Sequence, residues 1–168
     1  LGRFSPDKRQ LEQIMVAQKL HDYYFYIIGF VNSKEYFKSC SDYIKKNNIS
    51  NVKLIADATK KQMIELLSTS NYFIHSLRNE PFGITTVQAI QNDVIPIVHN
   101  SGGQKEIVPF NELRYDDIKG VLKVFSFLLK LPDNQKNIYI KKLKENIKNY
   151  NVSSFKHRLK KLIYKKLI

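Results

Sequence analysis

Short apolar runs of strand length alternate with segments of helical periodicity along this chain, and that alternation is the strongest constraint on its fold. The sequence predicts strands at 23–29, 52–55, 72–76 and 95–99, and a weaker one at 113–115. Parallel strands with helices on both faces read as continuous apolar runs of this kind. We therefore expect an α/β fold, a parallel sheet with helices on both faces, in one domain spanning residues 1–168.

Helix starts are marked by capping residues between these strands. The run Ser5-Pro6-Asp7 predicts a helix start with Ser5 as the N-cap, Ser33 predicts a second, and Thr59 with Gln62 has capping-box spacing. From about residue 116 onward the chain predicts three helical stretches. The last has apolar residues at helical spacing that we expect to anchor it on the domain: Phe155, Leu159, Leu162, Ile163 and Leu167.

The net charge of +13 is concentrated at one end of the chain. Residues 136–168 contain eleven Lys or Arg but one acid, Glu145, so the first 135 residues are nearly neutral. A basic tail on a nearly neutral body indicates a local anionic partner or a solvated helix face, rather than a nucleic-acid-binding domain. No run is long enough for a membrane span, and the single Cys40 excludes an internal disulfide framework.

The loops that follow the predicted strands are the expected ligand-binding region, because parallel sheets bind ligands at the carboxyl ends of their strands. Glu80 follows one strand, where a carboxylate can accept two hydroxyl hydrogen bonds from a sugar. Phe82-Gly83-Ile84-Thr85 then enters a helix, whose first N–H groups can bind an anion. A hydroxyl acceptor beside an anion site is what a nucleotide sugar needs. An arbitrary Glu-Pro loop would favour a buried Glu or a cap instead.

Two separated motifs resemble the large retaining GT-B family of glycosyltransferases, of the group 1 or family 4 type. Members carry Glu-x7-Glu, commonly as E-x-F-G-x-x-x-x-E-A, followed by a G-G-x-x-E turn. Here the first motif is Glu80, Phe82, Gly83 and Gln88-Ala89, and the second is Gly102-Gly103 with Glu106. The start, Gly2-Arg3 with Lys8, also fits, and Leu1-Gly2-Arg3 has the pattern of a strand tail. The resemblance runs from Leu1 to about Val108.

The resemblance implies the C-terminal, Rossmann-like half of a GT-B fold and a set of residue roles. Arg3 and Lys8 would neutralise the donor diphosphate, and Glu80 would bind sugar hydroxyls. The N–H groups of the four residues Phe82, Gly83, Ile84 and Thr85 would hold sugar and phosphate oxygens. We expect Arg3, Lys8 and Glu80 to be the catalytic residues, and Phe82, Gly83, Ile84, Thr85 and Gln88 to bind the donor.

Three positions depart from the family pattern. Gln88 replaces the second Glu, so its ribose contact loses the charge-assisted strength of a carboxylate, on the order of 1 kcal/mol. Asp57 lies where relatives often have Gly, and Arg9 replaces the Gly usual after the Lys. His75 and His99 are expected to be structural.

The resemblance further implies a metal-independent, retaining transferase without a cofactor, which moves mannose or glucose from a GDP- or UDP-sugar to a glycan or lipid-linked acceptor. In this family the acceptor site is on an N-terminal domain, so this chain alone is expected to be inactive. The run IPIVHNSGG (95–103) favours mannosyltransferases that elongate lipid-linked oligosaccharides. We expect a cytoplasmic protein, with peripheral contact to an anionic membrane and no nucleic acid. The alternatives are a noncatalytic nucleotide-sugar or nucleic-acid-binding module, and a sugar-nucleotide epimerase of the same architecture.

Overall fold

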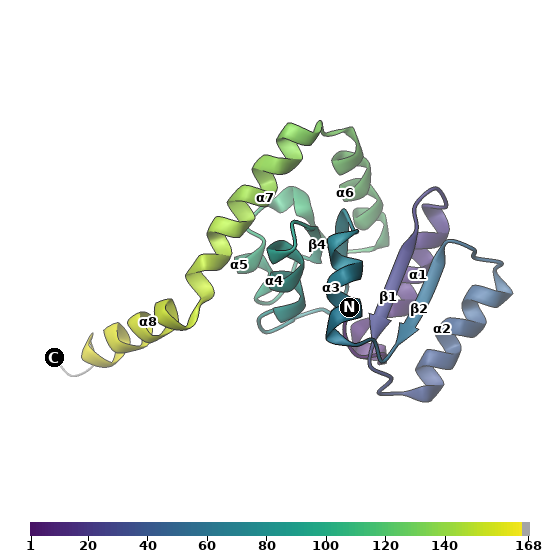
Figure 1. Ribbon diagram of the computed structural model, residues 1–168, viewed down its shortest axis with the longest axis horizontal. Helices are drawn as coiled ribbons and strands as arrows, with labels where there is room; N and C mark the ends of the chain where they lie inside the picture. Colours follow the sequence, from purple (N-terminus) through teal and green to yellow (C-terminus); the bar gives the residue numbers. More distant parts are fainter. Residues whose placement is uncertain (166–168) are drawn as a thin grey trace.

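The structure is a computed structural model, and it describes residues 1–165 of the chain. Helices and strands alternate along it as predicted, and β4 has the predicted bounds (Figure 1). The strands are β1 (Phe25–Gly29), β2 (Val52–Ala56), β3 (Tyr72–His75), β4 (Ile95–His99) and β5 (Arg114–Tyr115). The helices are α1 (Gln10–Lys19), α2 (Lys34–Lys46), α3 (Lys60–Ser68), α4 (Ile84–Gln91), α5 (Gln104–Ile107), α6 (Ile118–Lys130), α7 (Asp133–Ile147) and α8 (Val152–Lys165).

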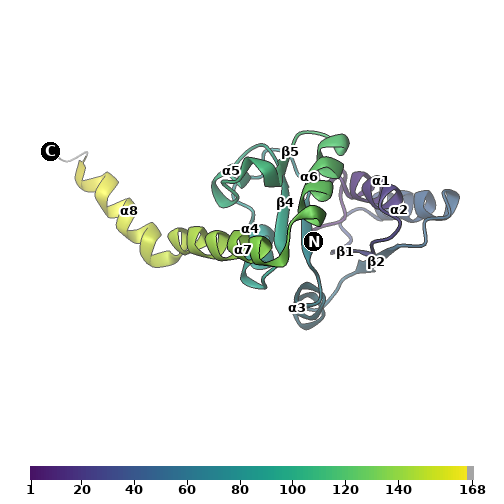
Figure 2. The same cartoon turned by 90° about the horizontal axis from the view of Figure 1, so that it is seen from above.

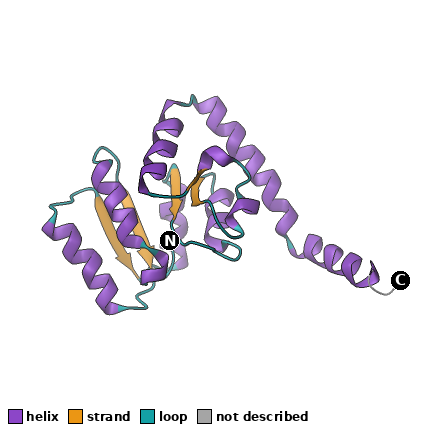
Figure 3. Ribbon diagram, turned by 180° about the vertical axis from the view of Figure 1, so that it is seen from behind, coloured by secondary structure: helices purple, strands orange, loops and turns teal. Residues whose placement is uncertain are grey.

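The strands pair in parallel throughout, but they form two sheets. Strand β1 pairs with β2, and a second sheet has the order β3-β4-β5. Figure 3 shows the two sheets as separate groups of orange arrows. The prediction of an α/β fold with parallel strands is confirmed, while the continuous sheet is interrupted between β1 and β3 in the described part of the chain.

Helices cover both faces of this arrangement. Helices α1, α2 and α6 lie on one side of the strands, and α3 lies on the other (Figure 2). One buried cluster joins β4, α4, α6 and α7 around Ile97, Phe125 and Leu143. A second joins α1, α2 and β1 around Ile14 and Cys40. The first cluster also includes Val16 of α1 and contacts Phe25 of β1, so apolar packing continues across the interruption between the sheets.

Two of the predicted helix starts are confirmed by their capping bonds. The Ser33 hydroxyl accepts the Tyr36 N–H, and Thr59 and Gln62 form a reciprocal capping box. Ser5 is an N-cap with Pro6 at the first helical position, as predicted, but the helix is a short 3-10 helix (Pro6–Lys8) and the Ser5 side chain makes no capping hydrogen bond. Helix α1 begins only after Arg9, whose left-handed backbone (φ 56°) ends that turn. The predicted strand at Tyr23 begins at Phe25.

Helix α8 is the largest difference from the expectation. It leaves the body after a 3-10 turn (Lys148–Tyr150) and projects away from it (Figure 1). Its apolar residues are exposed and do not anchor it on the domain: Val152, Phe155, Leu159, Leu162 and Ile163. Leu167 lies outside the described residues. Helical spacing gives a helix its apolar face, but it does not determine what covers that face.

Candidate functional site

Lys8 and Glu80 meet at the carboxyl end of β3. The Lys8 ammonium lies 3.1 Å from the Glu80 carboxylate, although 72 positions separate the two residues. Both side chains are mostly buried, with 21% and 16% of their surface exposed. The fold thus brings together two of the three predicted catalytic residues. Only Glu80 Oε2 makes this contact, so Oε1 remains available for a ligand.

His75, the last residue of β3, lies against the same carboxylate. Its Nε2 is 3.3 Å from Glu80 Oε2, and the ring is 5% exposed. Burial, together with the positive charges of the neighbouring amino terminus and Lys8, lowers the pKa of His75 to about 3. The imidazole is therefore neutral at physiological pH and contacts Glu80 without forming an ion pair. The sequence predicted a structural role for His75. Its position five residues before Glu80 was the one feature of the sequence that could have indicated the contact with that carboxylate.

The Gly102-Gly103 turn after β4 supports the loop that carries Glu80. The Gly103 N–H donates to the Glu80 carbonyl at 2.8 Å, and the Ser101 hydroxyl accepts the Asn79 N–H at 2.7 Å. A Cβ on Gly103 would lie 2.2 Å from the Pro81 carbonyl oxygen. A Cβ on Gly102 would lie 2.5 Å from the Glu80 carbonyl oxygen. Both glycines therefore allow two backbone segments to approach closely, which accounts for the second motif.

Helix α4 begins directly after this loop, as predicted. Gly83 is its N-cap with a φ of 97°, a conformation that favours glycine. The Gly83 carbonyl accepts the N–H groups of Thr86 and Val87, so those of Ile84 and Thr85 have no acceptor within the helix. Such first-turn N–H groups, at the positive end of the helix dipole, are typical hydrogen-bond donors to anions.

The remaining predicted residues lie around this centre without contacting it. The Arg3 side chain is 59% exposed, and its recorded ion pair is with Asp7 at 4.0 Å. Phe82 is partly exposed and its ring packs edge-on against Tyr150, with centroids 5.6 Å apart. Gln88 is half-buried on the second turn of α4. The contacts of the described residues do not fix the side chains of Arg3 and Gln88 on Glu80.

The two other departures from the family pattern, Arg9 and Asp57, both have left-handed backbones. Their φ angles are 56° and 52°, a region that costs non-glycine residues roughly 1 kcal/mol. Each has a local contact: Arg9 pairs with Glu12, and the Asp57 carboxylate accepts the Val31 N–H at 3.2 Å. Both positions thus have a backbone conformation that favours glycine.

His99 is structural, since its Nδ1 lies 2.8 Å from the Ser101 hydroxyl and its ring packs against Tyr115. Burial lowers the pKa of His99, and Arg78 contributes to the shift. The same Ser101 hydroxyl accepts the Asn79 N–H of the Glu80 loop. His99 therefore helps to position Ser101, and through it the start of the Gly102-Gly103 turn.

The family model described as "Glycosyl transferases group 1" matches residues 1–122. Two curated relatives carry the name GDP-Man:Man(3)GlcNAc(2)-PP-Dol α-1,2-mannosyltransferase. The Yarrowia lipolytica protein is 35% identical over 65 residues, which are 38% of this chain and 10% of that protein. The Dictyostelium discoideum protein is 41% identical over 51 residues, which are 30% of this chain and 10% of that protein.

Solved structures of glycosyltransferases share the fold. Anabaena HepE, determined with UDP and glucose, superposes with a TM-score of 0.76 at 18% identity, covering 98% of this chain and 47% of HepE. The catalytic domain of the cholesterol-α-glucosyltransferase of Helicobacter pylori superposes with a TM-score of 0.69 at 16% identity, covering 90% of this chain and 96% of that domain. The chain thus spans about half the length of HepE, and its match covers about a tenth of each mannosyltransferase.

Proposed function

The chain belongs to the group 1 glycosyltransferases, and we propose that it is the donor-binding half of a retaining, metal-independent enzyme. Its reaction would move a hexose, mannose or glucose, from a nucleotide-diphosphate sugar to a glycan or lipid-linked acceptor. The Lys8–Glu80 contact of 3.1 Å at the amino end of α4 carries this proposal. It places a cation, a hydroxyl acceptor and a helix N-terminus side by side, which is the set of groups that a nucleotide sugar requires.

The diphosphate would lie between Lys8 and the first turn of α4. The N–H groups of Ile84 and Thr85 donate to phosphate oxygens there, and Lys8 neutralises the charge that develops on the leaving diphosphate. Arg3 is close along the chain and exposed, so it can turn from Asp7 to the same phosphates. These charges are supplied by the chain itself, which supports a reaction without a metal ion.

The sugar would lie over Glu80, the only residue of this set with a carboxylate. Lys8 and neutral His75 both contact Oε2, which leaves Oε1 to accept sugar hydroxyls. Holding one oxygen from two sides restricts rotation of the carboxylate, so its orientation is set before the sugar binds. Glu80 thereby positions the hexose relative to the phosphates.

The nucleotide has two candidates. The names of the curated relatives specify GDP-mannose, and the HepE structure contains UDP. Matches to both mannosyltransferases are local sequence similarity, which supports GDP-mannose more directly than a fold shared at 18% identity. We therefore propose GDP-mannose as the first donor to test, with UDP-glucose as the second.

Calorimetry tests the proposal. We expect a GDP- or UDP-sugar to bind with equal affinity in Mg²⁺ and in EDTA, and Lys8→Ala to weaken binding by roughly 1.5–3 kcal/mol. Lys38→Ala is the matched control, because Lys38 is exposed on α2. No binding of any GDP-, UDP- or ADP-sugar, together with binding of single-stranded RNA, would support the nucleic-acid-binding alternative. Loss of sugar-nucleotide affinity in EDTA would contradict the independence from a metal ion, but not donor binding itself.

Helix α8 supports a further part of the proposal, peripheral contact with an anionic membrane. No helix in residues 1–165 is long and apolar enough to cross a bilayer. The exposed apolar residues of α8 share one face, at positions 152, 155, 159, 162 and 163. Its other faces carry Lys156, Arg158, Lys160 and Lys161, and the helix contains no acid. A basic amphipathic helix of this kind lies in the plane of an interface with its apolar face inserted.

Vesicle sedimentation separates membrane contact from a solvated helix. We expect binding to vesicles that contain anionic phosphatidylserine, weaker binding at high salt, and loss of binding in Leu162→Ser. Leu129→Ser, at an exposed position of α6, is the control. Equal binding to neutral vesicles would contradict an electrostatic attraction to anionic lipid. No binding at low salt would contradict membrane contact, and α8 would then contact another protein or only solvent. Membrane contact of this kind would locate the protein at the cytoplasmic side of a membrane.

A further inference from the structure

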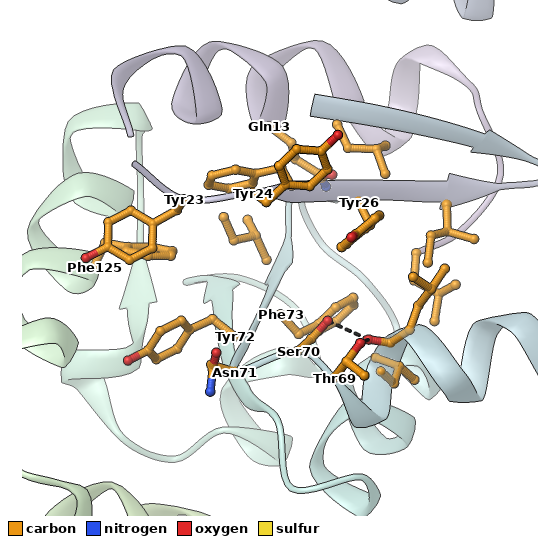
Figure 4. Close-up of a pocket in the computed structure, with 17 residues that line it drawn as sticks. Gln13, Tyr23, Tyr24, Tyr26, Thr69, Ser70, Asn71, Tyr72, Phe73 and Phe125 are labelled. Carbon is orange, nitrogen blue, oxygen red and sulfur yellow. Dashed lines mark hydrogen bonds between the residues drawn. The ribbon is translucent and has the colours of Figure 1, made fainter. Parts of the chain in front are cut away.

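Aromatic side chains join distant segments of the chain at several places. Tyr23 and Tyr72 pack on Phe125, with ring centroids 5.7 and 5.1 Å apart, and all three line a cavity of about 440 Å³ between β1 and β3 (Figure 4). No residue of the candidate donor site lines this cavity. The contact between Phe82 and Tyr150 is different, because Phe82 lies in the loop that carries Glu80.

Tyr150 reaches this loop from the far end of the chain. It is the last residue of the 3-10 turn (Lys148–Tyr150) that separates α7 from α8. Helix α7 runs across α4 and α5 and brings this turn beside the Glu80 loop, residues 76–83 (Figure 2). Tyr150 lies beyond residues 1–122, the part of the chain that the family model matches, so the family pattern assigns it no role.

The ring of Tyr150 supports Phe82 from one side. The two centroids are 5.6 Å apart and the ring planes are inclined by 63°, an edge-on arrangement that stabilises aromatic pairs beyond the area they bury. Phe82 directly precedes Gly83, the N-cap of α4. Because the peptide group between Phe82 and Gly83 is planar, a contact that holds Phe82 also restricts the direction of the Gly83 N–H.

The hydroxyl group of Tyr150 reaches the second motif. It donates to the Glu106 carbonyl at 3.2 Å, and the Asn146 amide of α7 donates to the carbonyls of Glu106 and Ile107 at 2.7 and 3.0 Å. These carbonyls end α5, where a helix has no acceptors' partners of its own. Helix α5 begins directly after Gly103, whose N–H supports the Glu80 loop. Tyr150 therefore contacts both motifs, one through its ring and the other through its hydroxyl.

Arg158 of α8 covers the ring of Tyr150. Its Cζ lies 5.6 Å from the ring centroid, which is within the range of a cation–π contact. Its Nη2 donates to the Asn149 carbonyl at 2.7 Å, and this bond holds the guanidinium group over the ring. The first turns of α8 are thus joined to the same residue that supports Phe82.

We propose that Tyr150 is a positioning residue of the donor site, which holds the Glu80 loop at Phe82 and α5 at Glu106 and is itself held by Arg158. The role rests on the proposed binding of a nucleotide sugar at this loop. Tyr150 acts on the sugar nucleotide through the two motifs. By keeping them in one arrangement before the donor arrives, it reduces the ordering that binding must otherwise bring about.

Two substitutions separate the ring of Tyr150 from its hydroxyl. Tyr150→Leu removes the edge-on contact and should weaken binding of GDP-mannose, or of UDP-glucose if that is the donor that binds, by about three- to tenfold in calorimetry. Tyr150→Phe keeps the ring, and the Glu106 carbonyl still accepts from Asn146. This conservative variant should therefore restore the affinity to within about twofold of the unmodified chain.

NMR relaxation of the ligand-free chain gives a readout that does not depend on a sugar. Tyr150→Leu should lower the order parameters of the Phe82 and Gly83 amides from about 0.85 toward 0.6. Arg158→Gln should lower the same order parameters and the donor affinity by less, about twofold for the affinity. Because Arg158 is exposed, this variant keeps the proposal falsifiable if Tyr150→Leu folds poorly.

Tyr139→Leu is the matched control. Tyr139 lies on α7, its ring packs edge-on against Phe110 with centroids 5.1 Å apart, and its hydroxyl donates to Glu112. It therefore makes the same kinds of contact as Tyr150, but not with the Glu80 loop. The control should lower Tm without changing the order parameters at Phe82 or the donor affinity.

The outcomes distinguish this role from the proposed function. Unchanged order parameters in Tyr150→Leu would overturn the proposal, and so would lowered order parameters with unchanged donor affinity. An equal loss of affinity in Tyr139→Leu would also overturn it, because the effect would then follow from stability. If the unmodified chain binds no nucleotide sugar, the proposed function fails, and the order parameters alone decide whether Tyr150 positions the loop.

Discussion

The contact between the Gly102-Gly103 turn and the Glu80 loop can be tested with one methyl group, in Gly103→Ala. The Gly103 backbone has φ −68° and ψ −12°, which alanine adopts without strain. Its new Cβ would lie 2.2 Å from the Pro81 carbonyl oxygen, where real Cβ contacts stay above 3.0 Å. The turn and the loop must therefore separate by roughly 1 Å, comparable to the overpacking that costs about 1–3 kcal/mol.

The displacement should reach the site because Gly103 N–H is bonded to the Glu80 carbonyl at 2.8 Å. We expect Tm to fall by about 4–8 °C, for a loss near 2 kcal/mol in a domain of this size. Affinity for the nucleotide sugar should fall by about tenfold or more, as one charge-assisted hydrogen bond is lost. Thermal denaturation and calorimetry measure the two effects.

Gly120→Ala is the matched control for this substitution. Gly120 lies on α6, where a Cβ would meet its nearest neighbour, the Tyr115 Cβ, at 3.1 Å. A small rearrangement there is offset by the gain of up to about 1 kcal/mol from replacing a helical glycine. We therefore expect little change in Tm and none in sugar affinity. If Gly103→Ala also leaves both quantities unchanged, close packing of the turn does not position Glu80.

Gln88→Glu should tighten binding of the nucleotide diphosphate by on the order of 1 kcal/mol, and the gain should vanish with a 2′,3′-dideoxyribose analogue; a gain blind to the ribose hydroxyls would remove Gln88 from the ribose site. Arg3→Ala should weaken diphosphate binding without changing Tm, since Arg3 is exposed; unchanged affinity in calorimetry would exclude its phosphate role. The folded protein holds His75 neutral down to about pH 3, so the unfolded chain binds the extra proton first and stability falls as pH drops below about 6.5. Urea titrations should show that the free energy of unfolding falls by about 2 kcal/mol between pH 6.5 and 5, and that this loss is absent in His75→Phe. An equal pH dependence of the free energy of unfolding in both proteins would contradict the burial of a neutral imidazole.

Much of the local structure is determined by the sequence alone. The apolar run at 95–99 forms β4 with the predicted bounds, and the caps at Ser33 and Thr59 begin α2 and α3. These features depend on hydrogen bonds and steric effects within a few residues, which a sequence pattern specifies directly. The α/β class and the loop of Glu80 at a strand end follow from the same alternation.

Contacts between distant segments were decided by the tertiary structure. Sequence patterns do not reveal that His75 lies against Glu80, that the Gly102-Gly103 turn packs on the loop before α4, or that β1 and β3 belong to different sheets. The helical spacing of Phe155 predicted a buried face in α8, and the structure leaves that face exposed. Periodicity fixes which side chains share a face, but burial depends on which other segment reaches that face, and only the folded chain determines this.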